Sequence, residues 1–256
     1  MYLTRGYLVR VGVGNFTTRR YFQKLSWASA TFTIMADMAM GTYGGNLKMR
    51  EQQTGRYADI LSWMYIASAT LRRFVAEGYR KEHEPFMHWV LKYSFAQIQL
   101  GFESIYNNFD RPFLKWIFKI NSFFTRVNSF GSLPGDELSN KLCDIVLTDM
   151  KTRDELTAGI HIPESKETSL GRYEHALKLI VMSEGIYNTI RKAMYKKIIP
   201  KGRISTSIDV ALQAKVITQN EADILRRAEE ARLDAIQVDS FDTQTYASGL
   251  LENHSA

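Results

Sequence analysis

The chain of 256 residues contains very little cysteine or proline. It has one cysteine, Cys143, and five prolines. These counts exclude an internal disulfide framework, a four-cysteine zinc site, a cysteine-ligated iron–sulfur cluster and a proline-rich low-complexity chain. Because so little cysteine is typical of proteins from reducing compartments, we expect a cytoplasmic protein.

Long hydrophobic runs are missing as well. The longest uncharged stretches, 25–36 and 60–71, have about twelve residues, whereas a helix needs roughly twenty to cross a bilayer. Arg10 interrupts the apolar run near the N-terminus, and no small-residue cleavage site follows, so the form of a signal peptide is absent. We therefore expect no transmembrane segment, which leaves a cytoplasmic location or peripheral attachment to the inner membrane.

Acidic residues are scarce in the first half of the chain. Residues 1–130 contain 17 Lys/Arg and 8 Asp/Glu, a net charge of +9, whereas residues 131–256 contain 16 and 19, a net charge of −3. A basic first half suits nucleic acid, an anionic membrane or an acidic partner. Its cations are spread along several helices and no nucleic-acid-binding motif contains them, so we expect no nucleic-acid partner.

Strand signals are nearly absent, and the dominant period is helical. One apolar stripe runs through residues 21–39 and ends at the glycine-rich break GTYGG (41–45). A second stripe runs from Tyr57 to Val75 and includes Leu61 and Tyr65. Two helices joined by a tight glycine turn predict an antiparallel hairpin. We expect Thr17 or Thr18 to be the N-cap of its first helix. A third long helix is expected from Pro85 to the pair 107–108, since proline suits the first helical position.

The second half predicts shorter helices. Two capping-box patterns, Thr152-x-x-Glu155 and Thr218-x-x-Glu221, mark helix starts. The fold class that we predict is all-α: a helical bundle, formed by an antiparallel helix hairpin plus a third long helix, followed by a smaller region of short helices. The predicted parts are a lead-in at 1–18, the helical bundle at 19–110, a basic aromatic segment at 111–130, a short-helix region at 131–242 and a polar tail at 243–256.

Catalytic motifs are conspicuously missing. The sequence has no Walker loop, no HExxH and no GxSxG pattern. Two acids inside apolar runs, Asp37 and Asp59, have two interpretations: a general base, or a buried structural acid paired with an arginine such as Arg56 or Arg72. We favour the structural interpretation, and a complete helical enzyme that uses Asp37 or Asp59 stays as an alternative.

The segment 113–127 (FLKWIFKINSFFTRV) gives the best local functional signal. It has nine large apolar residues, three basic residues and no acid. Such a helix is typical of an interfacial membrane anchor, and a core helix with snorkelling lysines is the alternative. The residues that we assign to a membrane or partner contact are Arg111, Lys115, Trp116, Lys119, Phe123, Phe124 and Arg126.

Three longer stretches are distinctive when they are taken together. They are ADMAMGTYGGNLKMRE (36–51), GRYADILSWMYIASATLRR (55–73) and ITQNEADILRRAEEARLDAIQVDSFD (217–242). They resemble the C-terminal helical, accessory domain of the bacterial long-chain acyl-CoA dehydrogenases of fatty-acid β-oxidation.

The resemblance implies a part in the FAD-dependent conversion of fatty acyl-CoA to trans-2-enoyl-CoA, with an electron-transferring flavoprotein as the partner that reoxidises the flavin. In that family the FAD and thioester sites and the glutamate base lie in catalytic domains upstream of this region. We therefore assign no catalytic, cofactor-binding or metal-binding residue, and we expect FAD in the full enzyme but none in this chain alone.

The resemblance also implies a role for this region. It would pack on the acyl-CoA dehydrogenase catalytic core, in cis or in trans, and support oligomer or membrane association rather than catalysis. Arg19, Arg20 and Lys24, at the start of the first helix, are candidates for contacts with the phosphates of CoA or with acids of that core. A stand-alone helical interaction or membrane-surface-binding protein is the alternative.

Overall fold

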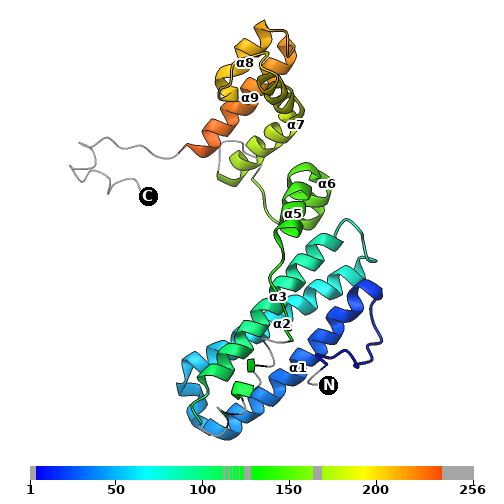
Figure 1. Ribbon diagram of the computed structural model, residues 1–256, viewed down its shortest axis with the longest axis vertical. Coiled ribbons are helices and arrows are strands. Elements are labelled where there is room, and N and C mark those ends of the chain that lie inside the picture. Colours follow the sequence, from blue (N-terminus) through cyan, green and yellow to red (C-terminus); the bar gives the residue numbers. More distant parts are fainter. Residues whose placement is uncertain are drawn as a thin grey trace, which may run out of the picture. The chain divides into compact units, whose positions relative to one another are not determined.

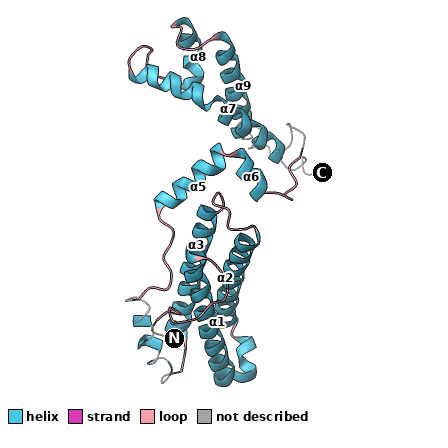
Figure 2. Cartoon of the chain, turned by 90° about the vertical axis from the view of Figure 1, so that its right-hand side faces the viewer, coloured by secondary structure: helices cyan, strands magenta, loops and turns pink. Residues whose placement is uncertain are grey.

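The computed structural model describes residues 4–111, 114, 116, 118–120, 122–123, 128–163 and 169–237. Throughout these residues Figure 2 shows helices joined by loops and turns, without a strand, so the all-α prediction is confirmed. The chain forms two compact units, 1–156 and 157–256. The boundary assigns the start of the predicted 131–242 region to the first unit.

Three long helices, side by side in Figure 1, build the first unit: α1 (Phe16–Tyr43), α2 (Glu51–Ala76) and α3 (Glu84–Asn108). A short 3-10 helix, η1 (Gly44–Met49), joins α1 to α2 at the predicted glycine break. Gly44 has a φ of +52°, a left-handed conformation that glycine adopts without a steric penalty. The antiparallel hairpin and the third long helix that the sequence predicts are therefore present.

Asn15 caps the N-terminus of α1, so the prediction of Thr17 or Thr18 as the N-cap is wrong. The Asn15 side chain accepts a hydrogen bond from the Thr18 backbone N–H at 3.0 Å, and the Thr18 Oγ1 accepts one from the Asn15 N–H at 3.0 Å. Thr18 is thus the second member of a capping box, which satisfies two backbone donors that the helix leaves unpaired.

An aromatic cluster forms the core of the first unit. Trp27 of α1 is 2% exposed, and its ring centroid lies 6.1 Å from that of Phe102 and 4.9 Å from that of Phe130. On α2 the buried side chains belong to Gln53, Ile60, Met64, Ala67, Leu71 and Phe74. Leu61 and Tyr65, which the predicted stripe also contains, are exposed.

Residues 128–131, here called the 128–131 loop, bind the start of α1 to the middle of α3. The Gln99 side-chain oxygen accepts hydrogen bonds from the backbone N–H groups of Phe130 and Gly131 at 2.8 and 3.0 Å. On the other side, Lys24 Nζ donates to the Phe130 carbonyl at 2.7 Å, and Arg5 donates to the Asn128 carbonyl. The loop therefore joins segments that lie about a hundred residues apart in the chain.

Two shorter helices, α5 (Asp136–Thr148) and α6 (Met150–Leu156), complete the first unit. Trp89 Nε1 donates to Ser139 Oγ at 3.1 Å and so ties α5 to α3. The predicted capping box at Thr152 is wrong, because Asp149 caps α6 by accepting hydrogen bonds from the backbone N–H and the hydroxyl of Thr152. Glu155 instead forms a salt bridge of 2.6 Å with Arg80.

The second unit consists of α7 (Ser169–Tyr195), α8 (Ile204–Gln213) and α9 (Gln219–Ile236) (Figure 2). The predicted capping box of Thr218 and Glu221 is confirmed at the start of α9. The core residues are Tyr187, Ile190, Ala193, Met194, Ile199, Ile208, Ala211, Ile217, Ala222 and Leu225.

A buried carboxylate, that of Glu229, connects two helices of the second unit. The Glu229 carboxylate of α9 accepts a hydrogen bond of 2.5 Å from the Tyr187 hydroxyl and forms a salt bridge of 2.9 Å with Arg232. Burial raises the pKa of the Glu229 carboxyl, but the hydrogen bonds from Arg232 and Tyr187 outweigh burial and hold this pKa below its ordinary value. The carboxylate therefore stays charged and links α7 to α9.

Candidate functional site

The two acids singled out in the sequence are exposed, so the prediction that they are buried is wrong. Asp37 lies two residues after Met35, on the opposite side of α1 from the buried line of Met35, Ala39 and Tyr43. Asp59 is also exposed, although its neighbour Ile60 is buried. Among the described residues neither acid forms an ion pair. The structure thus gives no support to the alternative of an enzyme built on Asp37 or Asp59.

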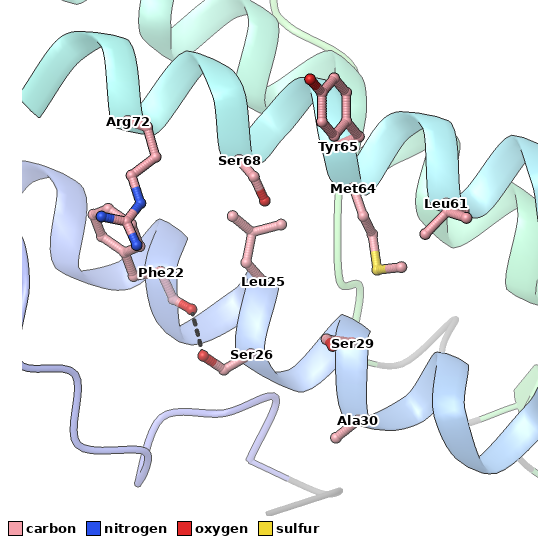
Figure 3. A pocket seen from close by; sticks show the side chains of 10 residues that line it. All are labelled: Phe22, Leu25, Ser26, Ser29, Ala30, Leu61, Met64, Tyr65, Ser68 and Arg72. Carbon is pink, nitrogen blue, oxygen red and sulfur yellow. Dashed lines mark hydrogen bonds between the residues drawn. The ribbon is translucent and has the colours of Figure 1, made fainter.

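The arginines expected to pair with these acids have other environments. Arg56 Nε donates to Ser104 Oγ at 2.8 Å and so links α2 to α3. Arg72 is exposed and extends from α2 toward Phe22 of α1 (Figure 3). Neither arginine compensates a buried carboxylate.

The basic aromatic segment is partly described, and the described residues separate into two faces. Trp116 is 66% and Phe123 63% exposed, and Arg111 and Lys119 are also exposed. In contrast, Phe118 is 1% exposed and its ring packs against Tyr106 and Phe109. The residues Lys115, Phe124 and Arg126 lie outside the described residues. Where the segment is described, its Trp and one of its Phe residues therefore face outward rather than into the core.

An open groove runs between α1 and α2 and has a volume of about 710 Å³ (Figure 3). Leu61 and Tyr65, which are 54% and 74% exposed, lie along it on the α2 side. The other residues that line it are Phe22, Leu25, Ser26, Ser29, Ala30, Met64, Ser68 and Arg72. Most of this lining is apolar or small, and Arg72 is the only charged side chain among the described residues that line the groove.

The chemistry of the groove suits packing better than catalysis. Ser26, Ser29, Ala30 and Ser68 have short side chains, which permit the backbone of another element to approach closely. The Ser26 hydroxyl already donates to the Phe22 carbonyl at 3.0 Å. The groove therefore has the properties of a surface that a further helix would cover.

Three cations gather at the start of α1, beside the 128–131 loop. Arg20 donates to the Arg5 carbonyl at 3.0 Å and lies over the Tyr7 ring at 4.1 Å, and Arg5 lies over the Trp27 ring at 4.5 Å. Burial, and then the charges of Arg20 and Arg5, lower the pKa of Lys24 from 10.5 to about 8. Arg20 and Lys24 thus hold loops in place through carbonyl and aromatic contacts.

The lowered pKa of Lys24 predicts that stability rises with pH in mildly alkaline solution. Between about pH 8 and 10.5 the unfolded chain holds a proton that the folded chain has released, so the free energy of unfolding increases by about 1–2 kcal/mol from pH 7.5 to 9.5. The pKa of Tyr21, raised to about 12 mainly by burial, acts in the opposite sense only above pH 10. Urea denaturation at a series of pH values measures the rise, and Lys24→Met should abolish it. An equal rise in this variant would contradict the assignment.

The second unit carries a basic surface that was not predicted from the sequence. Six cations lie between residues 191 and 203, and the run 185–208 contains no acid. All six side chains are exposed. The net charge of −3 for the second half hid this cluster, although the run RKAMYKKIIPKGR (191–203) is visible in the sequence. We call it the 191–203 surface, and its cations are Arg191, Lys192, Lys196, Lys197, Lys201 and Arg203.

No described helix is long and apolar enough to cross a membrane. No group of three or more His, Cys, Asp or Glu side chains in the described part of the chain could hold a metal ion.

The comparisons with known proteins agree with the resemblance found in the sequence. A family model described as "Acyl-CoA dehydrogenase, C-terminal, bacterial type" matches residues 1–241. No solved structure matches the chain. Because the family match covers nearly the whole sequence, this chain belongs to the family of bacterial-type acyl-CoA dehydrogenase C-terminal domains.

Proposed function

We propose that this chain is the accessory part of an FAD-dependent acyl-CoA dehydrogenase of fatty-acid β-oxidation, and that it packs on the catalytic core through the groove between α1 and α2. The observation that carries this proposal is the exposed apolar lining of that groove, in particular Leu61 and Tyr65. In this role the chain provides a packing surface and contributes no group to the dehydrogenation.

Covering the groove with another helix would stabilise the resulting complex. Burying one large apolar side chain contributes roughly 1.5–3 kcal/mol, and Leu61, Tyr65 and Leu25 lie close enough to be covered by one helix. The small side chains along the groove would let this helix approach in the manner of helix–helix packing elsewhere in proteins. A helix of the catalytic core is the occupant that the family membership supports.

The residues of the groove do not fit FAD. A flavin dinucleotide carries a pyrophosphate, which is usually held by backbone N–H groups at a glycine-rich helix start or by several cations. The groove instead offers the middle of two helices and, among its described lining residues, the single cation Arg72. We therefore propose that FAD, acyl-CoA and the electron-transferring flavoprotein are bound by the catalytic core.

The groove contact predicts a specific loss of binding. Leu61→Asp would place a charge in the covered surface and weaken binding to the separately purified catalytic core by about tenfold or more. Leu100→Asp is the matched control, because Leu100 of α3 is similarly exposed (61%) and lies outside the groove. Titration calorimetry measures both affinities. If both variants bind the core as tightly as the wild type, the contact lies elsewhere on the chain.

A second role, attachment to a membrane surface, is favoured by the outward-facing aromatic residues of the 111–130 segment. Trp116 and Phe123 are seven residues apart, two turns of a helix, so they share one face with Lys119. Indole and phenyl rings beside a cation suit the interface of an anionic bilayer. We propose that this face contributes to membrane attachment.

The membrane role predicts that the aromatic residues strengthen binding to vesicles. Trp116→Ser combined with Phe123→Ser should reduce sedimentation with vesicles that contain phosphatidylglycerol by about tenfold, because the apolar contribution to binding is lost. Leu100→Ser combined with Met182→Ser changes two comparably exposed side chains and serves as the control. Equal sedimentation of the two double variants would remove this segment from the proposal.

A further inference from the structure

We propose that the 191–203 surface docks on an anionic phospholipid membrane. This surface lies on the second unit and shares no residue with the 111–130 segment or with the groove of the first unit. The inference therefore adds a second, separate lipid-binding surface to the membrane contact proposed for the first unit, and it stands on different residues.

The packing of α7 in the second core leaves one face of this helix on the outside. Asn188, Arg191, Lys192, Tyr195 and Lys196 follow one another at spacings of three, one, three and one, so they form a single helical face with a shallow depression of about 430 Å³. The opposite face is held in the second core by side chains that are at most 8% exposed: Ile190, Ala193 and Met194. Because the core sets the rotation of α7, its cations are presented to the outside.

The turn after α7 adds an aliphatic side chain to the cations. Lys197 has a φ of +58°, and the N–H groups of Lys197 and Ile198 donate to the carbonyls of Met194 and Ala193 at 3.1 and 3.0 Å. This pattern is a Schellman cap, which turns the chain sharply at the helix end. Ile199 then enters the core, whereas Ile198 stays 58% exposed.

An exposed aromatic ring completes the surface. Tyr195 is 86% exposed and lies on the same face of α7 as Arg191 and Lys192. Tyrosine prefers the headgroup level of a bilayer, and an aliphatic side chain such as Ile198 can enter the boundary with the acyl chains. The surface thus combines cations for lipid headgroups with two side chains for the interface.

The positive charge of this surface is not compensated within the described residues. None of its six cations forms an ion pair there, whereas Arg226 and Arg232 of α9 pair with Asp209 and Glu229. Clusters of four to eight Lys and Arg residues are typical of surfaces that bind anionic lipids. The six cations are therefore available to an external anionic surface.

The composition favours a membrane over a protein or a nucleic acid. Four of the six cations are lysines, and lysine is depleted in protein–protein interfaces. Binding of single-stranded nucleic acid relies on several aromatic rings that stack on successive bases, and this surface has one exposed ring, Tyr195. A lipid surface requires only clustered charge and a few apolar contacts.

The test compares two variants of the full chain that lose the same charge. The surface variant carries Arg191→Gln, Lys192→Gln, Lys196→Gln and Lys201→Gln. The control carries Lys48→Gln, Lys81→Gln, Lys92→Gln and Lys151→Gln, which are exposed lysines of the first unit. Sedimentation is measured with phosphatidylcholine vesicles, with and without phosphatidylglycerol, and circular dichroism verifies that each variant is folded.

We expect the wild type to bind only the anionic vesicles, and more weakly as salt is added. Each cation near an anionic surface contributes about a fivefold gain in binding, so the surface variant should lose about tenfold or more while the control stays close to the wild type. Tyr195→Ser combined with Ile198→Ser should weaken the binding that remains at high salt, because that part is apolar.

Several results would overturn the proposal. One such result is a wild-type chain that does not bind anionic vesicles at low salt. Another is an equal loss of vesicle binding in the two charge variants, since this would indicate non-specific attraction. Loss confined to the Trp116 and Phe123 variant would assign lipid binding to the first unit alone. Binding of single-stranded DNA in preference to anionic vesicles would identify a nucleic acid as the occupant instead.

Discussion

Trp27→Ala should destabilise the first unit by about 3–5 kcal/mol, the range found when a buried tryptophan is truncated. Trp27 is 2% exposed and contacts the rings of Phe102 and Phe130 as well as the guanidinium of Arg5. Removing the indole leaves a cavity that the helices cannot close without moving the 128–131 loop. The four tryptophans of the chain, at positions 27, 63, 89 and 116, all lie in the first unit, so tryptophan fluorescence in urea reports the unfolding of this unit alone.

Trp116→Ala is the matched control for this experiment. It removes the same side chain from a position that is 66% exposed, and exposed substitutions usually change stability by less than about 0.5 kcal/mol. A large loss in the control, or a small loss in Trp27→Ala, would contradict the position of Trp27 at the centre of the core.

Gly131→Ala should destabilise the same unit by about 2–3 kcal/mol, because the added methyl group meets backbone rather than a movable side chain. A Cβ atom at Gly131 would lie closer than 3.0 Å to the carbonyl group of Phe95 and the nitrogen of Ala96. The loop would have to move away from α3, and this movement would weaken the hydrogen bonds from its N–H groups to Gln99. Tryptophan fluorescence in urea again measures the loss.

Gly135→Ala tests whether any glycine in this region behaves in the same way. A Cβ atom at Gly135 meets nothing within 4 Å, so the only expected cost is that of alanine in place of glycine at the N-cap of α5, which is less than about 1 kcal/mol. If the two alanine variants are equally stable, the close approach of the loop to α3 is wrong.

Helix periods, glycine breaks and the position of Pro85 are local signals, and they predicted the long helices and the hairpin. Exposure was harder to predict, because it depends on neighbouring helices. Leu61 and Tyr65 match the apolar period of α2, yet α1 and α3 cover only the side of α2 that carries Ile60 and Met64. The predicted burial of Asp37 and Asp59 was wrong for the same reason, because apolar neighbours in the chain did not indicate which face of the helix is buried.

The 128–131 loop was beyond prediction from the sequence. Its contacts with Gln99, Lys24 and Arg5 are long-range hydrogen bonds to backbone atoms, and backbone partners leave no pattern of residue types. The 191–203 surface, in contrast, was visible in the sequence and was obscured by averaging charge over half of the chain. Charge counted in short windows would have found it.

The 128–131 loop also has a consequence for the order in which the first unit folds. The hairpin contacts of α1, α2 and α3 join neighbours along the chain, whereas the Lys24–Phe130 and Arg5–Asn128 contacts close loops of more than a hundred residues. Contacts that close long loops bear a larger entropic cost and tend to form after local ones. We expect the helices to assemble first and the loop to dock after the rate-limiting step, so that Gly131→Ala accelerates unfolding and leaves the refolding rate nearly unchanged.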